Sequence, residues 1–233
     1  MRATRDLLRR RMHLMRQRAE LLAHIQTTNS QDNLPEIGTK LAYKANRQGV
    51  AERFPEPAVQ KSIEVDLALI DHDDYLLRDV ELCILKTAKQ HDSHTRYLRR
   101  TIPGIGEILS LVLLYEIHDI QRFPRVQDFV SYCRLGKCAR ESAGKRYGTS
   151  GTKIGNAALK WAFSEAAVLF LRTNPAGQKY LARLEKNHGK GKAFTILAHK
   201  LARAVYSMLK RHTAFDMATF LRGEGREAGE PSA

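Results

Sequence analysis

Hydrophobic residues recur at helical spacing along most of the chain, and this pattern predicts an all-α fold. Leu7, Leu14 and Leu21 repeat every seven residues in the first segment, which predicts a helical arm with one apolar stripe. A second long helix with coiled-coil spacing is expected from Ala58 to about His91. The polar, proline-containing residues 28–57 between them predict a linker with a short helix. We expect that short helix near residues 36–45.

The second half of the chain predicts a compact helical domain. Apolar periodicity predicts helices over 107–117, 126–134, 157–171 and 193–211. The helix at 157–171 is apolar on nearly all faces, so we expect it at the centre of the core. No segment alternates convincingly as a strand would. The expected organisation is a helical arm and coiled-coil linker at 1–95, a domain at 96–222 and a flexible tail at 223–233.

Charge is concentrated in three windows, and this indicates a polyanionic partner. The chain of 233 residues has a formal net charge of +14. Residues 1–26, 134–160 and 172–212 together hold 24 basic and 4 acidic residues, a net +20, so the remainder carries −6. Nucleic acid is the commonest polyanion that such segregation serves. The alternative is a set of solvated basic helix faces.

Several classes of protein and site are disfavoured by the sequence. No apolar run approaches the roughly 20 residues of a membrane helix, and the basic N-terminus lacks the apolar core of a signal peptide. Three cysteines indicate a reducing cytoplasm without a disulfide framework. The acidic run at 71–74 cannot converge on one metal ion if it is helical, because consecutive side chains point in different directions. We interpret it as a solvated acidic turn.

Residues 101–106 predict a sharp turn between two helices. Pro103 stops the first helix, while Gly104 and Gly106 allow the backbone to bend before the next helix begins. A helix–hairpin–helix of this kind can present backbone amides and a positive helix end to a DNA phosphate. The alternative is a plain connector between helices.

Two further segments have the composition of phosphate-binding elements. Residues 136–156 are rich in Gly, Ser, Lys and Arg, which suits gripping a phosphodiester and could also activate a serine; a simple binding loop is the alternative. The basic loop at 188–192 precedes a predicted helix and again suits a phosphate, although a mobile solvated loop is an equal alternative. Neither segment has the spacing of a Walker A loop.

An ordered series of motifs closely resembles the C-terminal domain of insertion-sequence 110 family transposases. The series comprises Ile102-Pro103-Gly104-Ile105-Gly106, Phe123, Arg140-Glu141-Ser142-Ala143-Gly144-Lys145, Lys153-Ile154-Gly155-Asn156 and Leu159-Lys160-Trp161-Ala162. It spans residues 101–172 and extends more loosely to Arg211. Arg5 to Arg11 is also similar to the segment that follows the RuvC-like domain of that family.

The resemblance implies DNA transposition with a nucleophilic serine and an acidic quartet that binds Mg²⁺. The serine maps onto Ser142, with Ser150 as the fallback and Lys145 nearby. The quartet would lie in an N-terminal RuvC-like domain that this chain lacks, so we expect no cofactor here and interpret the chain as an N-terminally truncated transposase. The expected DNA-binding residues are the turn and nearby cations: Gly104, Ile105, Gly106, Arg99, Arg100, Lys137, Arg140, Arg146, Lys153, Lys190 and Lys192.

The expected partners follow from the same reading. DNA is the main one, a guide RNA is used by some members of that family, and a homo-oligomer would assemble through the helical arm; no membrane partner is expected. The expected location is the bacterial cytoplasm, associated with the nucleoid. The alternative function is a non-catalytic helix–hairpin–helix module that binds DNA or RNA and regulates the full-length transposase.

Overall fold

The computed structural model describes residues 2–89, 101–142, 145–151 and 154–222, with the backbone alone described for the strand residues 137–142 and 145–151. The chain divides into two compact units, residues 1–90 and 91–233. The boundary expected at residue 95 falls within residues 90–100, which lie outside the described residues.

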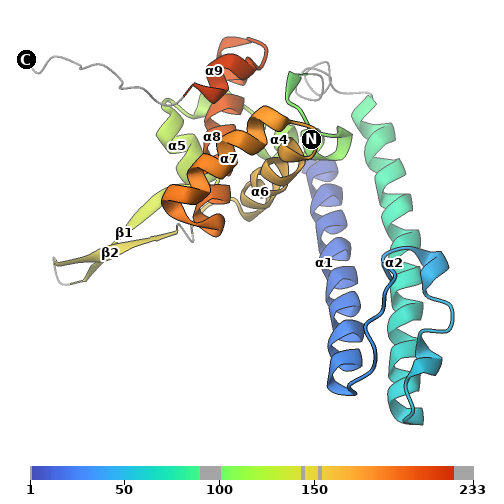
Figure 1. Cartoon of the computed structure of the whole chain (residues 1–233). Coiled ribbons are helices and arrows are strands. Elements are labelled where there is room, and N and C mark those ends of the chain that lie inside the picture. The colour runs from blue at the N-terminus through green and yellow to red at the C-terminus, as the bar shows by residue number, and fades with distance from the viewer. Residues whose placement is uncertain (1, 90–100, 143–144, 152–153, 223–233) are drawn as a thin grey trace, which may run out of the picture. The chain divides into compact units, whose positions relative to one another are not determined.

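The first unit is an antiparallel pair of long helices, α1 (Arg2–Gln31) and α2 (Pro57–Lys89), which lie side by side in Figure 1. Three cross-helix side-chain pairs fix their register. Arg11 bonds Glu81 at 2.6 Å, Arg18 bonds Asp74 at 2.6 Å, and His24 contacts Asp66 at 2.5 Å. As the number rises on α1 it falls by a similar amount on α2, as antiparallel packing requires.

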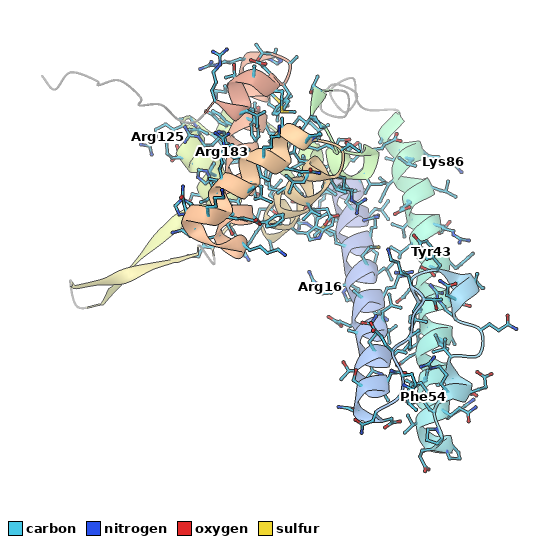
Figure 2. All side chains as sticks on the ribbon, in the orientation of Figure 1. Arg16, Tyr43, Phe54, Lys86, Arg125 and Arg183 are labelled. Atoms are coloured by element: carbon cyan, nitrogen blue, oxygen red, sulfur yellow. The ribbon has the colours of Figure 1, made fainter. Side chains whose placement is uncertain are left out.

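The connection between these helices contributes to their core. It holds two short 3₁₀ turns, η1 (Lys44–Asn46) and η2 (Ala51–Arg53), so the short helix expected near 36–45 is wrong. Leu41, Val50 and Phe54 from the connection pack with Ile25, Ile63 and Ile70 from the helices; Phe54 is labelled in Figure 2. Here burial of apolar side chains organises a segment whose local sequence favours turns.

A buried arginine attaches the connection to α2. Arg47 is 6% exposed and donates to the carbonyl oxygens of Leu41 and Ala42 and to the carboxylates of Asp71 and Asp74. Burial raises the pKa of Asp74, but hydrogen bonds from Arg47 and Arg18 outweigh it and hold that pKa below its ordinary value. The interpretation of residues 71–74 as a solvated acidic turn is therefore wrong, because Asp71 and Asp74 neutralise a buried guanidinium.

The second unit is a helical bundle around α6 (Ala157–Arg172). Ala162, Phe163, Ala166, Ala167 and Phe170 of this helix are fully buried, which agrees with its expected central place. The helices α4 (Glu107–Ile117), α7 (Pro175–His188) and α8 (Lys190–Arg211) pack against it, and α5 (Val126–Tyr132) packs on α8. The short turns η3 (Ile120–Arg122) and α9 (Met217–Leu221) complete the bundle.

The all-α class is confirmed, since helices build the cores of both units. One small departure lies between α5 and α6, where β1 (Lys137–Ser142) and β2 (Lys145–Gly151) form an antiparallel hairpin. Figure 1 shows this hairpin running out from the helices. A polar loop without strands was expected here. Among the described residues, no helix is long and apolar enough to cross a membrane.

Candidate functional site

The turn before α4 is packed against the central helix. Gly104 has φ +81°, and a Cβ on it would overlap the main-chain carbonyl of Leu169 on α6. Ile102 and Ile105 on either side are 2% and 4% exposed. Gly104 therefore allows a close approach between turn and helix, and the Ile105 side chain belongs to the core. The helix expected before this turn falls mostly in residues 90–100, outside the described part, together with Arg99 and Arg100.

Gly106 has a different environment from Gly104. It is the N-cap of α4 with φ −79°, no side chain caps the helix there, and a Cβ would meet nothing within 4 Å. The first amides of α4 therefore lack a side-chain acceptor at the cap, as a phosphate-binding helix start requires. A side chain at position 106 can probe that contact without straining the turn.

The hairpin register brings the candidate serine and lysine together. Ser142 pairs with Lys145 at the end of the two strands, across the connection at 143–144. The fallback Ser150 lies nearer the helices, where it pairs with Cys138. Only the first serine is thus a register partner of a cation.

Three of the expected DNA-binding cations also lie on the strands. Lys137 pairs with Gly151, Arg140 with Gly148 and Arg146 with Glu141, with an irregularity in register between Arg140 and Glu141. Lys153, the remaining cation expected here, lies outside the described residues. The strands therefore carry cations along their length, from the helical base to the Ser142 end.

A buried polar network anchors the base of this hairpin. Asn156, 8% exposed, caps α6 by accepting from the Leu159 amide at 3.0 Å and donates to the 2%-exposed Glu116 carboxylate of α4 at 2.7 Å. Its backbone amide donates to the carbonyl of Tyr132 at 2.7 Å. Asn156 thereby joins α4, α5 and α6 at the point where the hairpin returns.

The neighbouring Gly155 leaves no room for a side chain. Its φ is +122°, and a Cβ would lie 2.5 Å from the Tyr132 carbonyl oxygen. Arg134 donates from Nε to the Gly155 carbonyl at 2.9 Å. The Gly155-Asn156 part of the motif thus has a structural explanation, namely to fix where the second strand rejoins the helices.

Arg122 places a positive charge beside this anchor. Its guanidinium lies 4.5 Å from the ring centroids of both Phe123 and Tyr132. Burial raises the pKa of Tyr132, but hydrogen bonds from Asn156 and Arg122 outweigh it and lower that pKa overall. Sequence reasoning missed Arg122 and Tyr132, because their roles depend on contacts between separate elements.

A cationic corner forms where α7 meets α8. Gly189 ends the first helix and caps the second, so Lys190 and Lys192 lie in the first turn of α8 rather than in the loop that was expected. Both lysines are exposed, as are Lys186 and His188 at the end of α7. The first turn of α8 contains no acidic residue and no side chain caps it. The positive end of the helix dipole repels lysine side chains at a helix N-terminus, and a bound anion would reduce this repulsion.

The described residues do not form a metal site. Among them, no three His, Cys, Asp or Glu side chains are grouped so that they could hold an ion. Asp71 and Asp74 are bound to arginine and lysine side chains instead. These residues do not fit the Mg²⁺ ligand set of the resemblance, and we derive no chemical step through a metal.

Comparison with known proteins gives two findings, of which the family match lies within the second unit. Residues 97–182 match the family described as transposase IS116/IS110/IS902. A curated protein of Streptomyces coelicolor, named insertion element IS110 uncharacterized 43.6 kDa protein, is 27% identical over 120 residues. That alignment covers 50% of this chain and 29% of the relative. Residues 97–182, which match the family, include the Gly104 turn, the hairpin and the Asn156 anchor.

Proposed function

We propose that this chain acts in DNA transposition, binding DNA and supplying Ser142 as the nucleophile. The match of residues 97–182 to the family described as transposase IS116/IS110/IS902 supports this proposal. The observation that supports the proposal is the hairpin register, in which Ser142 is the backbone partner of Lys145 within the family-matched range. Ser150, the other serine on these strands, pairs with a cysteine.

The proposed reaction is a transesterification at a DNA phosphodiester. The Ser142 Oγ attacks phosphorus and forms a new P–O bond while the bond from phosphorus to the leaving deoxyribose oxygen breaks. The serine proton passes to a base, and the leaving oxygen takes up a proton. Lys145 and the hairpin arginines stabilise the negative charge that develops on the phosphoryl oxygens. The bond energy is kept in the serine–phosphate ester, which a DNA hydroxyl can later attack.

DNA binding is proposed to use backbone phosphates. The start of α4, where no side chain of Gly106 caps the helix, and the start of α8 both offer amide donors. At α8 these donors lie beside the exposed Lys190 and Lys192, whereas the first turn of α4 carries Glu107. Phosphate contacts orient a protein on DNA but carry little information about base sequence. We therefore expect these two helix starts to support affinity rather than target choice.

Self-association is proposed to use the first unit. Val65 and Leu69 of α2, one helical turn apart, are 49% and 40% exposed although they are apolar. A second copy of the helical pair could cover them, as in coiled coils. Sedimentation analysis should show a loss of oligomer in Val65→Lys/Leu69→Lys, with Lys86→Gln as a control on the same helix; unchanged sedimentation would remove α2 as the interface.

The nucleophile is tested by trapping a protein–DNA ester. The protein is incubated with supercoiled DNA carrying the ends of its own element, and covalent adducts are separated on denaturing gels. Ser142→Ala should abolish the adduct, whereas the matched hairpin variant Ser150→Ala should retain it. An adduct that survives Ser142→Ala and is lost in Ser150→Ala would reverse the assignment. Absence of any adduct with the parent protein would favour a DNA-binding role without catalysis.

A further inference from the structure

A pocket between α8 and the start of α9 combines features that the family match leaves unexplained, because it lies beyond residue 182. Its volume is about 420 Å³, and its lining comes from residues 200–211 of α8 and residues 213–220. In Figure 1 the two helices adjoin at the end of the chain that the structure describes. The lining includes Lys200, Arg203, Ser207, Arg211 and Phe215.

Polar and cationic side chains form a row along one wall of this pocket. Lys200, Arg203, Ser207 and Arg211 are separated by three or four positions on α8, so they occupy successive turns of one helix face. Helical rise places Arg203 and Arg211 about 12 Å apart along the axis. Two guanidinium groups at that separation can contact phosphates that flank one or two nucleotides.

The opposite wall is aromatic and held in position. Phe215 is half-buried, its ring centroid lies 5.2 Å from that of Phe220 and 6.3 Å from that of Phe170, and it lines the pocket. Lys200 Nζ lies 5.3 Å from the Phe220 centroid and donates to the Tyr180 hydroxyl at 3.2 Å. The rings of Phe170 and Phe220 therefore hold Phe215 in position, and a base stacked on it would meet a preorganised surface.

The one acidic residue of the pocket lining is already engaged. The Asp216 carboxylate accepts from the amides of Ala218 and Thr219 and from the Thr219 hydroxyl. It caps α9, and these hydrogen bonds lower its pKa. Donors of α9 therefore already satisfy the Asp216 carboxylate. An anionic ligand in the pocket would face the cationic side chains of α8.

We propose that this pocket binds one unpaired nucleotide of a nucleic-acid strand, with its base stacked on Phe215 and its phosphates on Arg203 and Arg211. Stacking on an aromatic side chain beside a cationic groove is how proteins bind single strands without reading sequence. A duplex offers no free base face to Phe215, so the pocket selects unpaired or distorted sites. The proposal rests on the proposed nucleic-acid-binding function and assigns it a second, strand-selective contact.

The test compares binding of fluorescein-labelled 12-nucleotide strands and a 20-base-pair duplex by the whole protein, using fluorescence anisotropy. Phe215→Leu keeps an apolar side chain but removes the stacking surface, and it should weaken single-strand binding roughly 5- to 100-fold while duplex binding changes less than twofold. Arg211→Gln, a change at an exposed position, should weaken single-strand binding more than the matched charge loss Lys179→Gln at an exposed position of α7. DNA and RNA strands run in parallel identify which polymer supplies the nucleotide.

Two outcomes would overturn the proposal, and they separate it from the proposed function. If the parent binds duplex but Phe215→Leu and Arg211→Gln bind single strands as the parent does, the pocket proposal fails and the function stands. If the parent binds neither duplex nor single strands, both fail. Thermal unfolding checks that Phe215→Leu is folded; if it is not, the comparison of Arg211→Gln with Lys179→Gln decides alone.

Discussion

Gly104 shows how one backbone conformation can hold a turn against a helix. A left-handed φ of +81° and the adjacent Leu169 carbonyl both exclude a Cβ. We predict that Gly104→Ala lowers the free energy of unfolding by about 2 kcal/mol or more, from the φ > 0 penalty and the overlap together. Urea denaturation measures it, with Gly106→Ala as the matched control, expected to change stability by about 1 kcal/mol or less. Equal stability of Gly104→Ala and the parent would contradict the close approach.

Asn156 combines a donor and an acceptor that no single substitution preserves. Asn156→Asp keeps the acceptor for the Leu159 amide but places a second carboxylate against buried Glu116. We predict a loss of about 2–4 kcal/mol at pH 7. Repulsion raises the folded-state carboxyl pKa, so this variant should regain stability as the pH falls toward 5.

A second substitution that rescues the stability of Asn156→Asp serves as its control. Glu116→Gln in the same protein restores an amide–carboxylate pair with donor and acceptor exchanged, and it should recover a large part of the lost stability in urea denaturation. If the double variant is no more stable than Asn156→Asp, the contact between α4 and α6 is not what position 156 contributes.

At the scale of elements, Arg47 determines how the connection is held against α2. Arg47→Met removes the donor to two carbonyls and two carboxylates, and it should cost about 2 kcal/mol. The pKa values of Asp71 and Asp74 are lowered in the folded protein. Their contribution is therefore present above the unfolded-state pKa near 4 and is lost as the pH falls through the lower folded values.

The lowered pKa values of Asp71 and Asp74 predict that the stability of the parent and that of Arg47→Met depend differently on pH. Stability of the parent should decline between about pH 4.5 and 2.5, and Arg47→Met should show a shallower decline over that range. Lys61→Gln, which removes only an exposed pair with Glu64, should leave the acid dependence unchanged. Parallel pH curves for Arg47→Met and the parent would rule out this ion pair as the cause.

The sequence predicts the long helices well because each has an apolar stripe that must be buried, and that stripe recurs with helical spacing. The helices at 107–117 and 157–171 were expected within one residue of their observed bounds. Helix α7 was missed, although Asn174 before Pro175 and Gly189 after His188 are helix start and stop signals. The sequence of the hairpin shows no alternation of apolar and polar residues, which is the signal that predicts a half-buried strand.

The candidate site was predictable only as a set of residue types. The resemblance identified Ser142 and Lys145, but their pairing depends on a register that includes an irregularity after Arg140. The roles of Glu116, Arg122 and Tyr132 arise from contacts between elements far apart in sequence. The site residues remain predictions that the experiments above address.

At the scale of the whole molecule, segregated charge predicts how DNA binding depends on salt. The logarithm of affinity should fall by about 0.9 per logarithmic unit of salt for each phosphate neutralised. Lys190→Gln/Lys192→Gln should reduce the slope by roughly two such contacts, and Lys61→Gln in the first unit should not change it. Fluorescence anisotropy between 50 and 200 mM salt measures this; a flat response of the parent would exclude phosphate contacts.

The cross-helix pairs of the first unit have a consequence for tolerance of insertions and deletions. Arg11–Glu81, Arg18–Asp74 and His24–Asp66 fix register independently of the length of the connection. One residue added beside exposed Gly38, which has open space around its Cα, lengthens only a loop. One residue added between Arg11 and Arg18 turns half of α1 by about 100°, separating its cations from their acids. Natural length variation in related chains should therefore concentrate near residue 38 and be rare within either long helix.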